Sequence, residues 1–325
     1  MGRVKHSLRL LGACAVVSTP MMMAASRPSI EGSFEAFWVE ARGRSLEDQV
    51  RLWDRWIEGP QQDLYASAVW EVRNHPDWKA RKARLLEARF ADYARVGDQI
   101  PGMIRILEKD LPSRLVSFRS LFPDTPTDLA VRVVVAPGFD AKSGVRADGS
   151  PVLLLAADSL LLEQANLDVL FPHELFHLYH ARHAGILNDG VMPGARLLLP
   201  LFVEGLATCV SVRLAPGSTE GQLLLQEDLG AIPEQRLPAI ATRFLAEADE
   251  PVLDGGPTTA FKRWFNAART PQQPDLPNRA GYWLGLHVIR ALLRDRSLQE
   301  LASWPPARAE AETQATLVRI AGPRH

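Results

Sequence analysis

Two histidines and a glutamate stand at a spacing suited to metal chemistry. Residues 171–180 read FPHELFHLYH, in which His173, Glu174 and His177 form the pattern HExxH. Residues i and i+4 of a helix point the same way, one turn apart, so both imidazoles can bind one zinc ion. The glutamate beside the first histidine can take a proton from a water activated by the metal. The pattern predicts a helix that binds one Zn²⁺ per chain, with Glu174 as general base.

The third ligand must come from elsewhere, because a catalytic zinc ion commonly has three protein ligands and an open position for water. Glu204 lies in a largely apolar stretch, residues 199–214, which we expect to form a helix that begins after Pro200. Burying a carboxylate in such a setting is costly unless it is paired or bound to a metal. We therefore predict Glu204 as the third zinc ligand.

The neighbours of Glu204 suit this role. Gly205 and Ala207 are small, and we expect them to let their helix approach the HExxH helix closely. Thr208 follows Glu204 by one helical turn. Its hydroxyl could orient a metal ligand from behind, since groups around a metal site commonly fix its ligands.

Two further histidines follow the motif. His180 lies about 10.5 Å from His173 along a helix axis, so one ion could hardly reach both. We expect His180 at the rim of the cleft or on the surface. His183 points roughly 120° away from His177 around the helix and is a still weaker candidate ligand.

The elements around the motif are mostly helical. Apolar residues recur at helical spacing from about residue 30 to 122. This region contains five tryptophans that we expect to anchor helix packing: Trp38, Trp53, Trp56, Trp70 and Trp78. Two apolar runs, 131–137 and 151–157, predict strands joined by a long loop.

Helical patterning resumes near Asp168, a reasonable N-cap that would leave Pro172 in or near the first turn, and it dominates to the C-terminus. The sequence thus predicts a mainly helical α+β fold, with a small β-sheet next to the HExxH helix.

The N-terminus predicts export. Residues 1–26 run from a basic segment through a short apolar one to small residues, which is typical of a Sec signal peptide. We divide the remainder into an N-terminal helical region, 27–125, and a zincin-like domain with a helical C-terminal part, 126–325. The segment LLGAC, ending at Cys14, is similar to a lipid-attachment signal, but Arg9 interrupts its apolar run. We expect a secreted or periplasmic protein, and a lipid anchor at Cys14 stays open as the less favoured alternative.

Composition narrows the range of partners. A formal net charge of -1 lacks the basic excess of nucleic-acid-binding proteins. The chain has no apolar stretch of about 18 residues, the length that would predict a membrane span. Removal of the signal peptide leaves Cys209 as the one cysteine, so we expect no intramolecular disulfide and a buried thiol.

A family resemblance strengthens these expectations. HExxH followed by a glutamate on a second helix is similar to the gluzincin arrangement of zinc metallopeptidases. More narrowly, FPHELFHLYH, LFVEGLATCVS and RAGYWLGLHVI resemble a bacterial family of predicted zinc-dependent proteases of unknown function. The resemblance covers about residues 170–290. Cys209 stands where an aromatic residue is common in that family.

The resemblance implies roles for individual residues. His173, His177 and Glu204 would bind zinc, and Glu174 would be the general base. Tyr282 or His287 would stabilise the oxyanion of the reaction, since hydrogen-bond donors aimed at developing charge are a large catalytic term. The alternative for Tyr282 is a packed helix residue.

The function predicted is zinc-dependent hydrolysis of a peptide or protein substrate. Strand 152–156, if it forms the edge beside the cleft, could hold an extended peptide by β-augmentation. Two alternatives stay open: a non-catalytic binding or chaperone-like protein that keeps a metallopeptidase fold, and a zinc hydrolase of a non-peptide bond. The intact Glu174 favours an enzyme over the first alternative.

Overall fold

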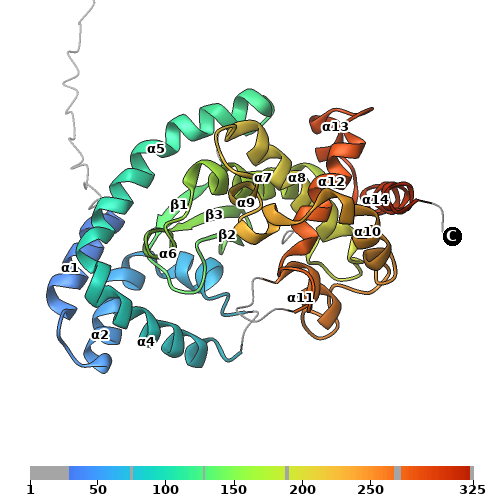
Figure 1. Cartoon of the computed structure of the whole chain (residues 1–325). Helices are drawn as coiled ribbons and strands as arrows, with labels where there is room; N and C mark the ends of the chain where they lie inside the picture. The colour runs from blue at the N-terminus through green and yellow to red at the C-terminus, as the bar shows by residue number, and fades with distance from the viewer. Residues whose placement is uncertain (1–28, 74–75, 127–128, 187–189, 267–271, 323–325) are drawn as a thin grey trace, which may run out of the picture.

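The computed structural model describes residues 29–73, 76–126, 129–186, 190–266 and 272–322. The predicted signal peptide, 1–26, and Cys14 within it lie outside these residues. The chain is mainly helical with one small sheet (Figure 1), which confirms the predicted α+β class.

The first part of the chain is a set of helices. Its α-helices are α1 Ile30–Ala41, α2 Leu46–Trp53, α3 Gln62–Leu64, α4 Trp78–Val96 and α5 Ile100–Leu121. Shorter π and 3-10 turns join them: η1 Asp54–Glu58, η2 Gly59–Gln61, η3 Tyr65–Val69 and η4 Gly97–Gln99.

The second part carries the sheet and the remaining helices. The strands are β1 Val131–Val134, β2 Ala141–Val145 and β3 Pro151–Ala156. The helices are α6 Ala157–Glu163, α7 Leu167–Ala184, α8 Leu198–Leu214, α9 Glu220–Leu223, α10 Leu237–Leu245, α11 Thr259–Phe265, α12 Ala280–Leu292, α13 Leu298–Ala302 and α14 Pro306–Ala321, with 3-10 turns η6 Glu227–Ala231 and η7 Glu234–Arg236.

The layers follow chain order. Helices α1, α2, α4 and α5 lie at one end of the molecule, the sheet and α7 and α8 lie in the middle, and α10 to α14 lie at the other end (Figure 1). One large apolar core runs through all three parts, and Val169, Ala215 and Leu223 form a small second cluster. In the described part of the chain, no helix combines the length and the apolar character needed to cross a membrane.

The tryptophans of the first part anchor helix packing, as predicted. Trp38, Trp53 and Trp70 are buried in the core, and Trp56 and Trp78 pack against it while partly exposed. The ring of Trp53 meets that of Phe37 edge to face, with centroids 5.6 Å apart, a preferred geometry for aromatic pairs.

The sheet differs from the prediction in two ways. The expected loop contains β2, so the sheet has three strands in the order β1-β3-β2. β2 reads AKSGV, a sequence with weak strand preference, and its antiparallel ladder with β3 outweighs that composition. β3 pairs with β1 on its other side, so it is the central strand. The prediction that 152–156 forms an edge for a peptide is therefore wrong, because β-augmentation needs a free edge.

Helix α7 begins earlier than expected. Its N-cap is Asn166, whose side chain accepts a hydrogen bond from the backbone N–H of Asp168. Asp168 is thus the second helical residue instead of the cap, and Pro172 lies beyond the first turn. Arg114 of α5 donates to the Leu167 carbonyl and to the Asp168 carboxylate, so Asp168 ties the start of α7 to α5.

Helix α8 also begins before its proline. Pro200 is the third residue of the helix, a position where the missing N–H needs no helical partner. Gly205 does not face α7 as predicted: a Cβ there would lie 2.4 Å from the carbonyl oxygen of Gly285 in α12. A Cβ on Gly285 would in turn lie 2.5 Å from the Leu201 carbonyl oxygen. Two glycines therefore allow α8 and α12 to cross in backbone contact.

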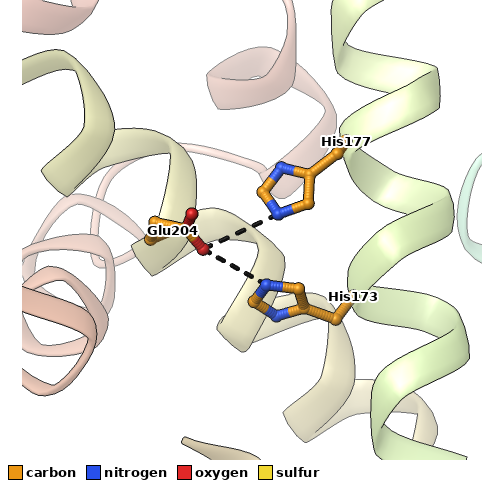
Figure 2. A group of neighbouring side chains, drawn as sticks. All are labelled: His173, His177 and Glu204. Carbon is orange, nitrogen blue, oxygen red and sulfur yellow. Dashed lines mark hydrogen bonds and ion pairs between the residues drawn. The ribbon is translucent and has the colours of Figure 1, made fainter. Parts of the chain in front are cut away.

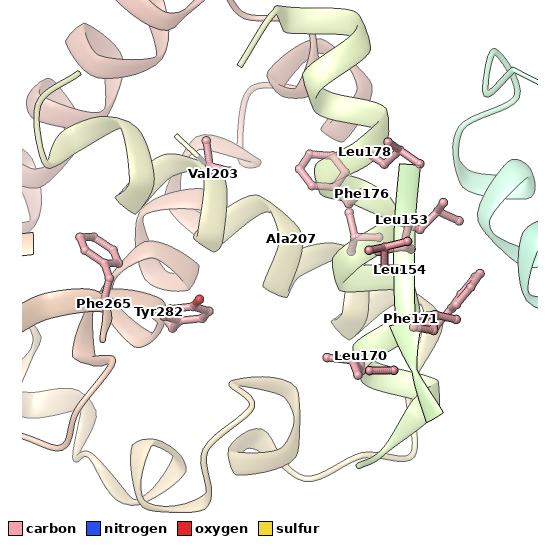
Figure 3. Packing of buried hydrophobic residues seen from close by; sticks show 14 of the residues in the cluster. Leu153, Leu154, Leu170, Phe171, Phe176, Leu178, Val203, Ala207, Phe265 and Tyr282 are labelled. Carbon is pink, nitrogen blue, oxygen red and sulfur yellow. The ribbon is translucent and has the colours of Figure 1, made fainter. Parts of the chain in front are cut away.

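Packing on the other side of α8 fixes α7. Figure 3 shows Leu153 and Leu154 of β3 with Phe171 and Phe176 of α7 on one side of α8, and Tyr282 of α12 on the other. These side chains all belong to the continuous core. Helix α8 is consequently held between α7 and α12.

Candidate metal centre

The three predicted ligands come together. His173 and His177 project from α7 toward Glu204 of α8 (Figure 2). Oε2 of Glu204 lies 3.2 Å from Nε2 of His173 and 3.6 Å from Nε2 of His177. The three side chains form the one group of histidine, cysteine and acidic residues in the described part of the chain whose ligand atoms lie close enough together for one ion, within 4.8 Å of one another.

The group is shielded from solvent. His173 is 1% exposed, His177 4% and Glu204 6%. Burial alone would raise the pKa of the Glu204 carboxyl, but the imidazoles of His177 and His173 outweigh burial and hold that pKa well below its usual range. Burial lowers the pKa of His173 against the pull of Glu204. An ionised carboxylate and a neutral imidazole are the forms in which these side chains bind metals.

The spacing fits a metal ion. Zinc binds histidine nitrogen and carboxylate oxygen at about 2.0–2.2 Å, which in a tetrahedral shell separates ligand atoms by about 3.3–3.6 Å. The two measured contacts span about this range. Nδ1 of His173 is buried and has no hydrogen-bond partner among the described residues, so Nε2 carries the contact to Glu204. His173, His177 and Glu204 can thus hold a metal ion, and the two-nitrogen, one-oxygen donor set suits a transition metal better than Mg²⁺ or Ca²⁺.

Two supporting residues sit next to the ligands in sequence. Glu174 is half-buried on α7, directly after His173. Thr208 is fully buried one turn after Glu204, and its hydroxyl has no hydrogen-bond partner in the described part of the chain. The predicted role of Thr208, orienting a ligand by a hydrogen bond, therefore has no counterpart in this geometry.

Of the two C-terminal candidates, the structure brings Tyr282 to the group. The ring of Tyr282 stacks on that of His173, with centroids 6.0 Å apart and planes 10° from parallel. His287 lies about 140° further around α12. Its ring packs on Trp283, and the charged side chains that influence its pKa are Arg290, Glu234 and Glu220. We therefore retain Tyr282 beside the metal ligands and place His287 elsewhere.

His180 is not at the rim of a cleft or on the surface, contrary to prediction. It is 1% exposed, with its ring against Phe176 and Phe202. Burial lowers the pKa of His180 to about 3, so the ring is neutral. The prediction for His180 failed because α8, α13 and the sheet together cover α7, including the side that carries His180.

His183 lies on the more exposed side of α7. Its Nε2 is 3.1 Å from a carboxylate oxygen of Asp124, and its Nδ1 is 3.0 Å from the Tyr179 carbonyl oxygen. Tyr179 donates from its hydroxyl to the same carboxylate. His183 is thus paired with Asp124 and is not part of the group formed by His173, His177 and Glu204.

Arg279 is a residue of the site that the sequence did not single out. Its guanidinium lies over the ring of Tyr282, 4.6 Å from the centroid, and Nη2 donates to the Tyr282 hydroxyl oxygen at 3.3 Å. It also acts electrostatically on His173 and Glu204. Its one sequence signal was its place directly before the segment AGYW.

Comparison with known protein families, with curated proteins and with solved structures finds no match to this chain.

Proposed function

We propose that the chain is a zinc-dependent metallopeptidase of the gluzincin kind. The observation that carries this proposal is that a glutamate from a second helix lies 3.2 and 3.6 Å from the two histidines of an HExxH helix. The resemblance of the three sequence blocks to predicted bacterial zinc proteases supports the same function. His173, His177 and Glu204 would hold the ion.

The zinc ion and the side chains of the protein would contribute different parts of the reaction. Zinc, when bound, would lower the pKa of a water molecule and polarise the scissile carbonyl. Glu174 would accept the proton of the attacking water on its carboxylate and pass it to the leaving amine. The Tyr282 hydroxyl accepts a hydrogen bond from Arg279, and its O–H would donate to the substrate oxygen as charge develops there.

Burial contributes to this chemistry. The ligands sit among apolar side chains of the core, where electrostatic interactions are stronger than in water. The predicted signal peptide, 1–26, supports a periplasmic or extracellular peptide or protein as substrate. We infer that the enzyme acts outside the cytoplasm.

A substrate screen tests the proposal. Zinc-loaded protein is incubated with peptide, ester and simple amide substrates, beside Glu174→Gln and the control Glu35→Gln, which alters an exposed glutamate of α1. We expect peptide hydrolysis that falls by about 10²–10⁴-fold in Glu174→Gln, with zinc retained, and that is unchanged in the control. Hydrolysis of esters alone would favour a non-peptide hydrolase. If Glu174→Gln loses hydrolysis but keeps the full biological effect of the wild type, a non-catalytic binding protein is favoured.

A further inference from the structure

Arg279 combines a half-buried side chain, whose Nε is shielded from solvent, with a strained backbone. It occupies the N-cap position of α12 with φ +59° and ψ 22°, in the left-handed region. Leu225, whose carbonyl oxygen lies 3.5 Å from Nη1 of Arg279, also has a positive φ, +56°. Left-handed conformations in residues other than glycine are strained and cluster at functional sites. Arg279 itself and Leu225, whose carbonyl lies beside the guanidinium, are both strained in this way. This indicates that the fold holds the guanidinium in a defined position for a functional reason.

The guanidinium lacks an acidic partner. Among the described residues Arg279 forms no ion pair, and its Nε is buried without a hydrogen-bond partner. Two other shielded cations among the described residues do have acids: Lys82 lies 2.6 Å from Glu58, and Arg89 lies 3.5 Å from Asp158. A buried charge is costly unless it is paired. We therefore expect the Arg279 guanidinium to bind an anion that does not belong to the described residues.

The surroundings keep that charge in place. Burial by itself lowers the pKa of Arg279, but Tyr282 and the Glu204 carboxylate outweigh it and raise that pKa. The guanidinium also lies over Tyr282, whose ring stacks on His173. One side of its planar fork is made by the unpartnered Nε–H together with Nη2, which has a second N–H besides the one donated to Tyr282. Such a fork matches the two oxygens of a carboxylate.

We propose that Arg279 binds a carboxylate of the substrate beside the scissile peptide bond, so that the enzyme selects peptides with a negative charge at this place. This inference rests on the proposed peptidase function. The carboxylate has two sources, the C-terminus of the peptide or an aspartate or glutamate side chain. Tyr282 then holds the guanidinium with its ring and hydroxyl, next to the metal ligands.

Matched peptide pairs test the proposal. One pair differs in a free C-terminal carboxylate against a carboxamide, and a second pair differs in glutamate against glutamine at an interior position. We measure kcat/KM for each with zinc-loaded wild type, Arg279→Gln and Arg279→Lys, beside the control Arg290→Gln from the exposed end of α12. A charge-assisted hydrogen bond corresponds to a preference of about tenfold or more.

We expect wild type and Arg290→Gln to prefer the charged member of one pair, and Arg279→Gln to lose that preference. The pair that shows the preference identifies the source of the carboxylate. Arg279→Lys keeps the charge but not the fork, so it should retain part of the preference, and it serves as the test if Arg279→Gln does not fold. No preference in wild type overturns the proposal. So does a preference that survives in Arg279→Gln, or an equal loss on both members of a pair.

A binding measurement separates this proposal from the proposed function. Fluorescein-labelled versions of the same peptides are titrated with the Glu174→Gln protein, and fluorescence anisotropy reports binding without turnover. The charged member should bind about tenfold more tightly, and the added Arg279→Gln substitution should remove the difference. If the zinc-loaded wild type cleaves no peptide but Glu174→Gln shows Arg279-dependent binding, the peptidase function is contradicted and the carboxylate site is supported. Equal binding of both members would overturn the carboxylate site even if hydrolysis is observed.

Discussion

The crossing of α8 and α12 makes Gly205→Ala an informative substitution. The added Cβ would lie 2.4 Å from the carbonyl oxygen, 2.5 Å from the carbonyl carbon and 2.9 Å from the Cα of Gly285. These are backbone atoms that cannot rotate away, so the two helices must separate. Helix propensity favours alanine over glycine by about 1 kcal/mol, whereas overpacking costs about 1–3 kcal/mol or more. We expect a net loss of up to roughly 2 kcal/mol in the free energy of unfolding.

The same shift should reach the metal centre. Glu204 precedes Gly205, so any displacement of α8 moves the carboxylate relative to the histidines of α7. Contacts of 3.2 and 3.6 Å leave little tolerance for such a movement, and we expect zinc affinity to fall by about tenfold, at the lower end of the effect of altering groups that support metal ligands.

Urea denaturation and zinc competition with a chromophoric chelator measure the two effects. The control is Gly102→Ala in α5, where a Cβ would meet only Nη2 of Arg105, at 4.0 Å. We expect this control to raise the free energy of unfolding by up to about 1 kcal/mol and to leave zinc affinity unchanged. If Gly205→Ala stabilises the protein as much as the control does, with the same zinc affinity, our account of the α8–α12 contact is refuted.

Three further predictions concern buried side chains. The pKa of His180 is about 3 in the folded chain and near 6.5 when unfolded, so the unfolded state binds an extra proton between these values and stability falls as pH drops below about 6.5. His180 should thus contribute a loss of about 2 kcal/mol at pH 5 relative to pH 7 in the metal-free wild type. His180→Phe should lose about 2 kcal/mol less than wild type over this range, and equal losses in both proteins in urea titrations would contradict this. Asp158 accepts hydrogen bonds from the Ala136 N–H and the Tyr93 hydroxyl and lies 3.5 Å from Arg89. Asp158→Ala should therefore lower the free energy of unfolding by about 3–5 kcal/mol in the same assay. A change below about 1 kcal/mol would show that these contacts of Asp158 add little to stability. Burial raises the pKa of the Cys209 thiol, so a thiol reagent should react slowly with native protein and fast in urea; rapid reaction of the native chain would count against burial.

The helical character of the fold and the residues of the candidate metal centre were predictable from sequence, because both depend largely on local sequence patterns. His173 and His177 are one turn apart, and the apolar setting of Glu204 indicated a buried carboxylate. The same reasoning placed the two apolar strands. The distance between Glu204 and the histidines follows from helix packing, which only the structure gives.

The wrong or missing predictions concern features that depend on tertiary contacts. β2 forms because β3 offers a ladder of hydrogen bonds to a sequence of weak preference. Gly205 lies against α12 instead of α7, and the spacing of residues in α8 does not indicate which of these two helices it contacts. His180 is buried because α8, α13 and the sheet surround α7. Arg279 lies more than a hundred residues from His173 in sequence, so its place beside Tyr282 depends on how α12 packs on α8.

Metal content tests the central claim most directly. We would measure zinc per chain by mass spectrometry for wild type, Glu204→Ala and the control Glu35→Ala, each purified, equilibrated with zinc and freed of excess ion. We predict about one zinc per chain in wild type and in the control, and its loss or marked weakening in Glu204→Ala. Zinc retained undiminished in Glu204→Ala would show that Glu204 is not the third ligand, and no zinc in wild type would contradict the metal centre itself.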